Sequence, residues 1–127
     1  MALLLDTHVI LWMAQEPERL QGIVRDKLSS EDILLFSYAS VWELAIKSAI
    51  RKIDLQWSIK EFVDLAMQKH ALQMLEISLP HIYHTQQLPL HHRDPFDRLL
   101  IAQSIVESIP IISSDSIFDA YGIERIW

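Results

Sequence analysis

Cysteine is absent from the sequence, and glycine is nearly so. Without cysteine, the chain has neither disulfide bonds nor thiolate metal sites. The two glycines, Gly22 and Gly122, stand far apart, so a phosphate-binding P-loop and the G-x-G-x-x-G turn of dinucleotide-binding folds are both excluded. These absences remove most nucleotide-binding interpretations of the chain.

Long apolar runs are also missing. No uncharged apolar segment is long enough to span a bilayer. Residues 1–6 lack the positively charged start and the small-residue cleavage site of a signal peptide. We therefore expect a cytoplasmic protein.

Basic residues are outnumbered. The chain has 11 Lys and Arg against 17 Asp and Glu, for a net charge of −6. This balance argues against passive nucleic-acid binding, which needs a basic surface to displace counterions. It leaves open a nuclease whose acidic site is charged by divalent cations and flanked by basic residues that hold phosphate.

Apolar residues, by contrast, make up 50% of the 127 positions, which predicts one domain with one core over residues 1–127. Short apolar runs alternate with helical stretches. The pattern predicts an α/β fold, a three-layer α/β/α sandwich with a central parallel β-sheet. The predicted strands are 2–5, 33–36, 72–77, 110–113 and 123–126, and the predicted helices are 8–15, 17–28, 40–50, 58–69, a short one at Pro80, 94–108 and 116–121.

Four carboxylates occupy related places in this pattern. Asp6 ends the first strand, and Asp115 follows the strand at 110–113. Glu43 and Asp97 fall in the first turns of predicted helices. The carboxyl ends of parallel strands share one edge of a sheet, so we expect the four side chains to converge there. Such a group repels itself unless cations intervene, and oxygen ligands suit Mg²⁺ or Mn²⁺.

Each acid except Asp6 also has a structural interpretation. Ser40 and Glu43 have the S-x-x-E spacing of a capping box, as do Ser58 and Glu61. Asp94 before Pro95 is a strong helix N-cap, and Asp97 would favour the helix dipole. Asp115 fits a helix cap as well. Asp6 has no capping pattern of its own, because it ends a wholly apolar strand.

Four segments together resemble the ordered motifs of PIN domains, and most closely those of the toxin branch named VapC. They are residues 3–8 (LLLDTH), 40–47 (SVWELAIK), 94–103 (DPFDRLLIAQ) and 113–115 (SSD). The resemblance extends over residues 2–126. Two departures are visible: Arg51-Lys52 stands where many relatives have Gly-Lys, and Ser113 replaces a frequent Thr. Neither departure falls on one of the four acids.

The resemblance implies a Mg²⁺-dependent (or Mn²⁺-dependent) endoribonuclease, the toxic component of a toxin–antitoxin pair. It implies a cognate antitoxin that covers the acidic groove, and a homodimer. The family's acidic quartet falls on Asp6, Glu43, Asp97 and Asp115. Asp6 and Asp97 are expected to be the primary metal ligands, and Glu43 and Asp115 to hold a second metal or orient the attacking water. Asp94 matches an acid common in this branch and is expected to support the quartet.

Several other polar residues have two interpretations each. Thr7 either binds water or a phosphate oxygen, or makes a turn bond at the strand end. Lys47 either faces the scissile phosphate or pairs with Glu43 four residues earlier. Arg93 and Arg98 either contact the RNA backbone or form salt bridges with the acids.

His91 and His92 suggest a transition-metal site with Asp94, but no third nitrogen ligand is placed by the sequence, so solvated loop histidines are favoured.

Two acidic Mg²⁺-binding folds of other classes compete with the nuclease. A phosphoacceptor receiver domain needs paired acids after the first strand and a lysine after the last, yet Thr7 follows Asp6 and the chain ends at Ile126-Trp127. A haloacid-dehalogenase-type phosphatase needs Asp-x-Asp, and His8 takes the place of the second acid. A third alternative, a binding domain without catalysis, is disfavoured by the four acids.

Overall fold

The structure is a computed structural model that describes residues 1–30 and 32–127. Five parallel strands form one sheet with the order β3-β2-β1-β4-β5. This arrangement confirms the predicted α/β class with a central parallel sheet. The strands are β1 (Ala2–Leu5), β2 (Ile33–Ser37), β3 (Gln73–Leu75), β4 (Ile111–Ile112) and β5 (Arg125–Ile126).

Strand β1 lies in the middle of the sheet, which is why its sequence is a continuous apolar run. Leu4 pairs with Leu35 on one side and with Ile111 on the other. Successive side chains point to opposite faces: Leu3 and Leu5 pack into one core cluster, and Leu4 into a second. All three leucines are fully buried. The central strand therefore joins the cores of both faces.

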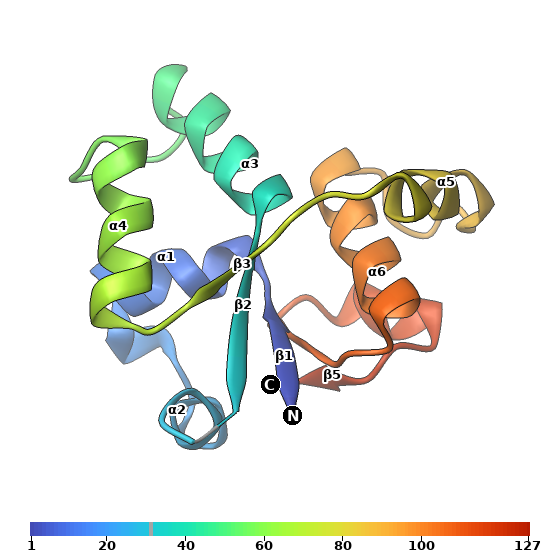
Figure 1. Cartoon of the computed structure of the whole chain (residues 1–127), viewed down its shortest axis with the longest axis horizontal. Coiled ribbons are helices and arrows are strands. Elements are labelled where there is room, and N and C mark those ends of the chain that lie inside the picture. The colour runs from blue at the N-terminus through green and yellow to red at the C-terminus, as the bar shows by residue number, and fades with distance from the viewer. Residues whose placement is uncertain (31) are drawn as a thin grey trace.

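Helices cover the two faces of the sheet (Figure 1). They are α1 (Thr7–Gln15), α2 (Gly22–Leu28), α3 (Tyr38–Ala49), α4 (Ile59–Lys69), α5 (Leu79–Gln87) and α6 (Pro95–Glu107), with 3₁₀ helices η1 (Pro17–Arg19) and η2 (Ser116–Tyr121). Phe62 of α4 and Val9 of α1 belong to the first cluster, and Leu100 of α6 and Phe118 of η2 to the second. Within the described residues, no helix combines the length and hydrophobicity that crossing a membrane requires.

Every predicted element is present, but several bounds differ from the prediction. Strands β3, β4 and β5 are shorter than the predicted 72–77, 110–113 and 123–126, and α5 is longer than the short helix predicted at Pro80. The start of α3 and the segment 17–28 also differ. Helix α3 begins at Tyr38, because Ser37 at the end of β2 is its N-cap and accepts a hydrogen bond from the Ala39 N–H. The predicted capping box of Ser40 and Glu43 is therefore wrong. The segment 17–28 divides into η1 and α2, since Leu20 and Gln21 are extended between them.

The strand register decides which side chains meet at the carboxyl edge of the sheet. The Asp6 N–H continues the ladder beyond β1 and donates to the Ile112 carbonyl at 2.9 Å. Asp6 therefore leaves the sheet beside Ser113, which follows β4. On the other side of β1, strand β2 runs directly into α3 at Tyr38. The first turns of α1 and α3 and the loop after β4 thus lie around one point.

Candidate active site

Asp6 is buried at the junction of β1 and α1. It occupies the N-cap position of α1, but among the described residues its side chain makes no capping bond. Instead, Oδ2 accepts a hydrogen bond from the Ser113 hydroxyl at 2.7 Å. Oδ1 has no hydrogen-bond partner among the described residues, although the residue is only 4% exposed. An unpaired carboxylate oxygen at such depth is costly unless a ligand satisfies it.

Glu43 shows the same combination of burial and an unpaired oxygen. It lies in the second turn of α3 and is 2% exposed. Oε2 accepts a hydrogen bond from the Lys47 ammonium at 2.6 Å, which is the predicted pair at i,i+4. Oε1 has no partner among the described residues. Because α3 begins at Tyr38, helix capping does not explain this carboxylate.

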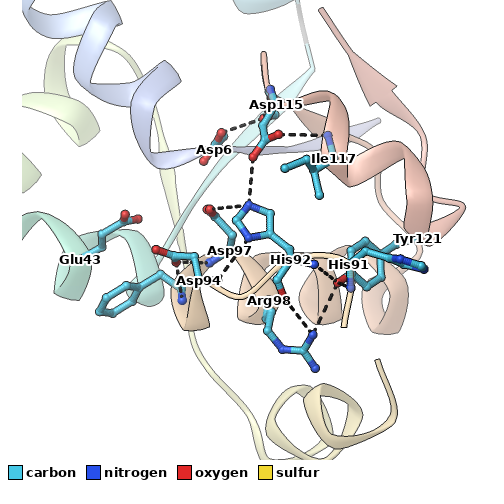
Figure 2. Close-up of polar contacts among 12 residues, drawn as sticks. Asp6, Glu43, His91, His92, Asp94, Asp97, Arg98, Asp115, Ile117 and Tyr121 are labelled. Atoms are coloured by element: carbon cyan, nitrogen blue, oxygen red, sulfur yellow. Dashed lines mark hydrogen bonds and ion pairs between the residues drawn. The ribbon is translucent and has the colours of Figure 1, made fainter. Parts of the chain in front are cut away.

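Asp94 and Asp97 come from the start of α6. Asp94 is the N-cap, as its sequence position predicted, and its Oδ1 accepts the backbone N–H groups of Phe96 and Asp97 at 2.9 and 3.0 Å. Asp97 does no capping. Figure 2 shows its carboxylate directed away from the helix axis, toward His92 and the side of the cluster where Asp6 and Asp115 lie.

Asp115 is tied to Asp6 through Ser113. The Asp115 N–H donates to the Ser113 hydroxyl oxygen at 3.0 Å, and that hydroxyl donates to Asp6. Asp115 caps η2 through Oδ1, which accepts from the Ile117 N–H at 3.0 Å. Its other oxygen faces the acidic group (Figure 2). In the sequence, Ser113 stands out only as a departure from a family preference, so this bridge was not predicted.

We call Asp6, Glu43, Asp94, Asp97 and Asp115 the acidic cluster. The pKa of Asp97 is raised to about 8. Burial is the largest cause, and the charges of Asp6, Asp94, Glu43 and Asp115 add to it. Burial also raises the pKa of Asp6, against the Ser113 hydrogen bond that lowers it. Within residues 1–30 and 32–127, no Lys or Arg forms an ion pair with Asp6, Asp97 or Asp115. The cluster therefore binds protons in the absence of a cation.

His92 belongs to this cluster, contrary to the prediction of a solvated loop histidine. Its Nε2 lies 3.0 Å from Asp97 Oδ2 and 3.0 Å from Asp115 Oδ2. The ring is 13% exposed and packs against Phe118. His91 points away and contacts the ring of Tyr121. The ring lies over the start of α6, where its Nδ1 accepts the Asp94 N–H at 3.2 Å, and nothing in the local sequence pattern predicted this position.

The predicted supporting residues are held by contacts within the chain. The Thr7 hydroxyl donates to the Ser40 hydroxyl at 2.8 Å and links α1 to α3. Burial alone would lower the pKa of Lys47, but its hydrogen bond to Glu43 and the charges of Glu43, Asp94 and Asp97 outweigh burial and raise it. Arg98 donates to carbonyl oxygens of the segment 85–92 rather than to the acids.

The donor set fits a hard divalent cation. Among the described residues, Asp6 Oδ1 and Glu43 Oε1 are buried oxygens without hydrogen-bond partners. The neighbouring acids place Asp97 in a negative electrostatic potential, which a bound cation would relieve. In addition, one oxygen each of Asp97 and Asp115 and one nitrogen of His92 lie within 4.8 Å of one another. Carboxylate oxygens in this number suit Mg²⁺ or Mn²⁺.

The profile of the PIN domain family matches residues 3–124, and the chain belongs to this family. No curated protein matches the chain by sequence.

Three solved structures share the fold. A chain in VapBC2 from Rickettsia felis, bound to a DNA fragment from their promoter, aligns with a TM-score of 0.75 and 12% identity over 99% of this chain and 98% of that chain. A chain of VapBC-1 from nontypeable Haemophilus influenzae aligns with a TM-score of 0.68 and 18% identity, over 99% of this chain and 97% of that chain. A chain of FitAcB from Neisseria gonorrhoeae aligns with a TM-score of 0.64 and 21% identity, over 98% of this chain and 96% of that chain.

The raised pKa of Asp97 predicts how the metal-free protein responds to pH. The folded state binds a proton on Asp97 up to about pH 8, whereas the unfolded chain releases it near the ordinary aspartate pKa of 3.8. Because the folded state holds more protons in this window, this carboxyl makes stability fall as pH rises from 4 to 8. The slope approaches about 1.4 kcal/mol per pH unit for one group.

The measurement is urea unfolding with a chelator at several pH values. Asp97→Asn is expected to flatten the decline between pH 5 and pH 8, whereas Asp26→Asn, at an exposed position on α2, should follow the parent. Parallel slopes for the parent and Asp97→Asn would contradict the raised pKa.

Proposed function

We propose that this chain is a divalent-cation-dependent endoribonuclease that hydrolyses RNA phosphodiester bonds. The observation that carries the proposal is the acidic cluster itself: buried carboxylates with unpaired oxygens at the carboxyl edge of a parallel sheet. PIN domains are in general nucleases, which supports this chemistry for a member of the family. The overall negative charge is consistent with it, because bound cations reverse the local charge.

In this proposal, Asp6 and Asp97 are the primary cation ligands, with Mg²⁺ or Mn²⁺ as the ion. Glu43 and Asp115 hold a second cation or orient the attacking water. When bound, a divalent cation would lower the pKa of a water molecule and would neutralise charge that develops on the phosphate in the transition state. The buried position of Asp6 and Glu43 keeps their oxygens fixed before substrate binds.

Four further residues are proposed to support the site. Lys47 holds Glu43, Thr7 joins the two helices that begin beside Asp6, and Asp94 fixes the first turn of α6. Arg98 anchors the preceding loop. Arg93 is exposed next to this turn, so we assign phosphate contact to Arg93 rather than to Arg98.

The rival receiver fold is not supported by the topology. A receiver has the strand order 2-1-3-4-5, whereas this sheet has the order β3-β2-β1-β4-β5. The phosphatase interpretation is not supported either, since a phosphatase of this type needs Asp-x-Asp and His8 stands at the position of the second acid.

Replacement of Asp6 by Asn tests whether the acidic cluster is catalytic. We expect the parent to cleave structured RNA when Mg²⁺ or Mn²⁺ is added, and Asp6→Asn to lose at least about 100-fold in rate, in line with the loss of a group that stabilises transition-state charge. Removing one like charge should leave the metal-free melting temperature equal or higher, while Mg²⁺ stabilises the variant less than the parent. Cleavage assays and melting curves with and without Mg²⁺ measure both effects.

Asp26→Asn serves as the control and is expected to behave as the parent. If Asp6→Asn cleaves RNA as fast as the parent, or if millimolar Mg²⁺ leaves the parent's melting temperature unchanged, the acids are structural and the nuclease proposal is wrong.

We further propose that the chain is the toxin of a toxin–antitoxin pair and acts in the cytoplasm, where its RNA substrate lies. The fold it shares with chains of VapBC and FitAB complexes supports this assignment. The cognate antitoxin would cover the acidic cluster from the adjoining apolar surface. A hollow of about 690 Å³ between α3 and α4, lined by Trp42, Val63 and Met67 among others, offers an apolar surface on the helix that carries Glu43.

The toxin proposal predicts growth arrest that depends on Asp6. Induced expression of the chain alone in bacterial cells should slow growth, whereas Asp6→Asn, produced at equal level, should not. Growth curves with immunoblots for protein amount provide the measurement. Equal arrest by both proteins would separate toxicity from the acidic cluster and contradict the proposal.

A homodimer is proposed from the apolar surface of α3 and α5. Trp42 is 60% exposed, and Ile50, Ile82 and Tyr83 are also exposed. Trp42, Ile82 and Phe96 line a hollow of about 580 Å³ between these helices and α6. A large exposed apolar patch on a protein surface often marks a site of interaction with another protein.

Ile82→Glu is expected to convert the dimer to monomer, because a carboxylate buried in an apolar interface is strongly unfavourable. Light scattering at micromolar concentration measures the mass. Ile23→Glu on α2 is the matched control, since Ile23 is equally apolar and exposed but lies on another helix. A monomeric parent, or a dimeric Ile82→Glu, would refute this interface.

A further inference from the structure

His92 brings an imidazole into the acidic cluster from the loop before α6. Its Nε2 contacts Asp97 Oδ2 and Asp115 Oδ2, both at 3.0 Å. These are two of the four acids proposed to hold cations. One nitrogen therefore joins carboxylates that come from α6 and from the loop after β4 (Figure 2).

The hydrogen on the imidazole is placed by Asp94. The backbone N–H of Asp94 lies 3.2 Å from His92 Nδ1, and because an N–H only donates, Nδ1 accepts. A neutral imidazole with an accepting Nδ1 carries its hydrogen on Nε2. Nε2–H then donates a hydrogen bond to Asp115 Oδ2 at 3.0 Å and lies 3.0 Å from Asp97 Oδ2, and Nε2 has no lone pair free for a metal ion.

The backbone of His92 is fixed by contacts outside the cluster. Its N–H donates to the Tyr121 hydroxyl oxygen at 2.7 Å, and its carbonyl accepts from Arg98 at 3.2 Å. The Tyr121 hydroxyl in turn donates to the Pro89 carbonyl at 2.8 Å. The ring of Phe118 packs on the imidazole with its centroid 5.7 Å away. The direction of Nε2–H is therefore set independently of the acids it contacts.

We infer that His92 is a positioning residue: its Nε2–H holds Asp115 by a hydrogen bond, and its close contact with Asp97 keeps that carboxylate beside Asp115, in the orientation that binds the divalent cation, without ligating the cation itself. The inference rests on the proposed cation-dependent function and adds a residue to it. Hydrogen-bond partners of metal ligands fix the orientation of those ligands, and their loss weakens metal binding by about 10- to 100-fold.

Two variants separate the two ends of the imidazole. The amide of His92→Asn reaches the position of Nδ1 and keeps an acceptor for Asp94, but it does not reach the carboxylates. The longer side chain of His92→Gln returns an N–H donor near the position of Nε2. His91→Ala is the control, because the neighbouring ring contacts Tyr121 and lies outside the acidic cluster.

Mn²⁺ alone is the probe, with free ion measured by electron paramagnetic resonance. We expect His92→Asn to bind Mn²⁺ about 10- to 100-fold more weakly than the parent. His92→Gln should recover most of the loss, and His91→Ala should match the parent. Thermal melting confirms that each variant is folded. A merely structural role for the Asp94 contact would give the opposite order, with His92→Asn equal to the parent.

A second measurement determines which ring nitrogen of His92 carries the hydrogen. Nitrogen-15 spectra of the metal-free parent should show the Nε2–H form of His92, identified by the signals that His92→Asn lacks. His81 provides an internal comparison, since its Nδ1 accepts from the Ser78 N–H and its Nε2 lies 2.8 Å from Glu107. With Mn²⁺ bound, spin-echo spectra should show no nitrogen coupling.

The outcomes distinguish this inference from the proposed function. An Nδ1–H form of His92, nitrogen coupling to Mn²⁺, or parent-like affinity in His92→Asn would overturn the positioning role, while cation-dependent RNA cleavage by the parent would still stand. A parent that binds no Mn²⁺ and cleaves no RNA would overturn both.

Discussion

Repulsion among buried carboxylates is the constraint on which this structure depends. Asp6 and Glu43 are almost fully buried, and Asp97 carries a pKa of about 8 because burial and four neighbouring acids disfavour its charge. At short range and low dielectric, such repulsion reaches several kcal/mol. A fold that retains this arrangement must hold the acids rigidly and must gain from the ligand that relieves them.

The chain holds the acids with neutral donors rather than with a ring of cations. Ser113 donates to Asp6, backbone N–H groups at helix starts donate to Asp94 and Asp115, and His92 contacts Asp97 and Asp115. Lys47 is the lysine that pairs with a member of the cluster, at Glu43, among the described residues. Neutral donors orient carboxylates while leaving their charge available, so the cluster keeps its attraction for a divalent ion.

The two cores provide the rigidity that this arrangement requires. Leu3 and Leu5 of β1 pack on one face of the sheet, and Leu4 on the other, so the strand that ends at Asp6 is fixed from both sides. Burying side chains of this size contributes roughly 1.5–3 kcal/mol each. The loop that carries His92 is fixed differently, by Arg98 and Tyr121 through backbone hydrogen bonds. Rigid elements thus support the acids, and a hydrogen-bonded loop supports the imidazole.

The sequence by itself determined the alternation of strands and helices, the parallel sheet and the positions of the acids at strand ends and helix starts. These follow from local periodicity and from the rule that parallel strands share a carboxyl edge. Only the tertiary structure decided which polar groups meet. Ser37 takes the N-cap that the sequence pattern assigned to Ser40, because β2 and α3 join without a loop. The contact of His92 with Asp97 and Asp115 depends on a loop held by residues up to 29 positions away, and no local pattern encodes such a distance.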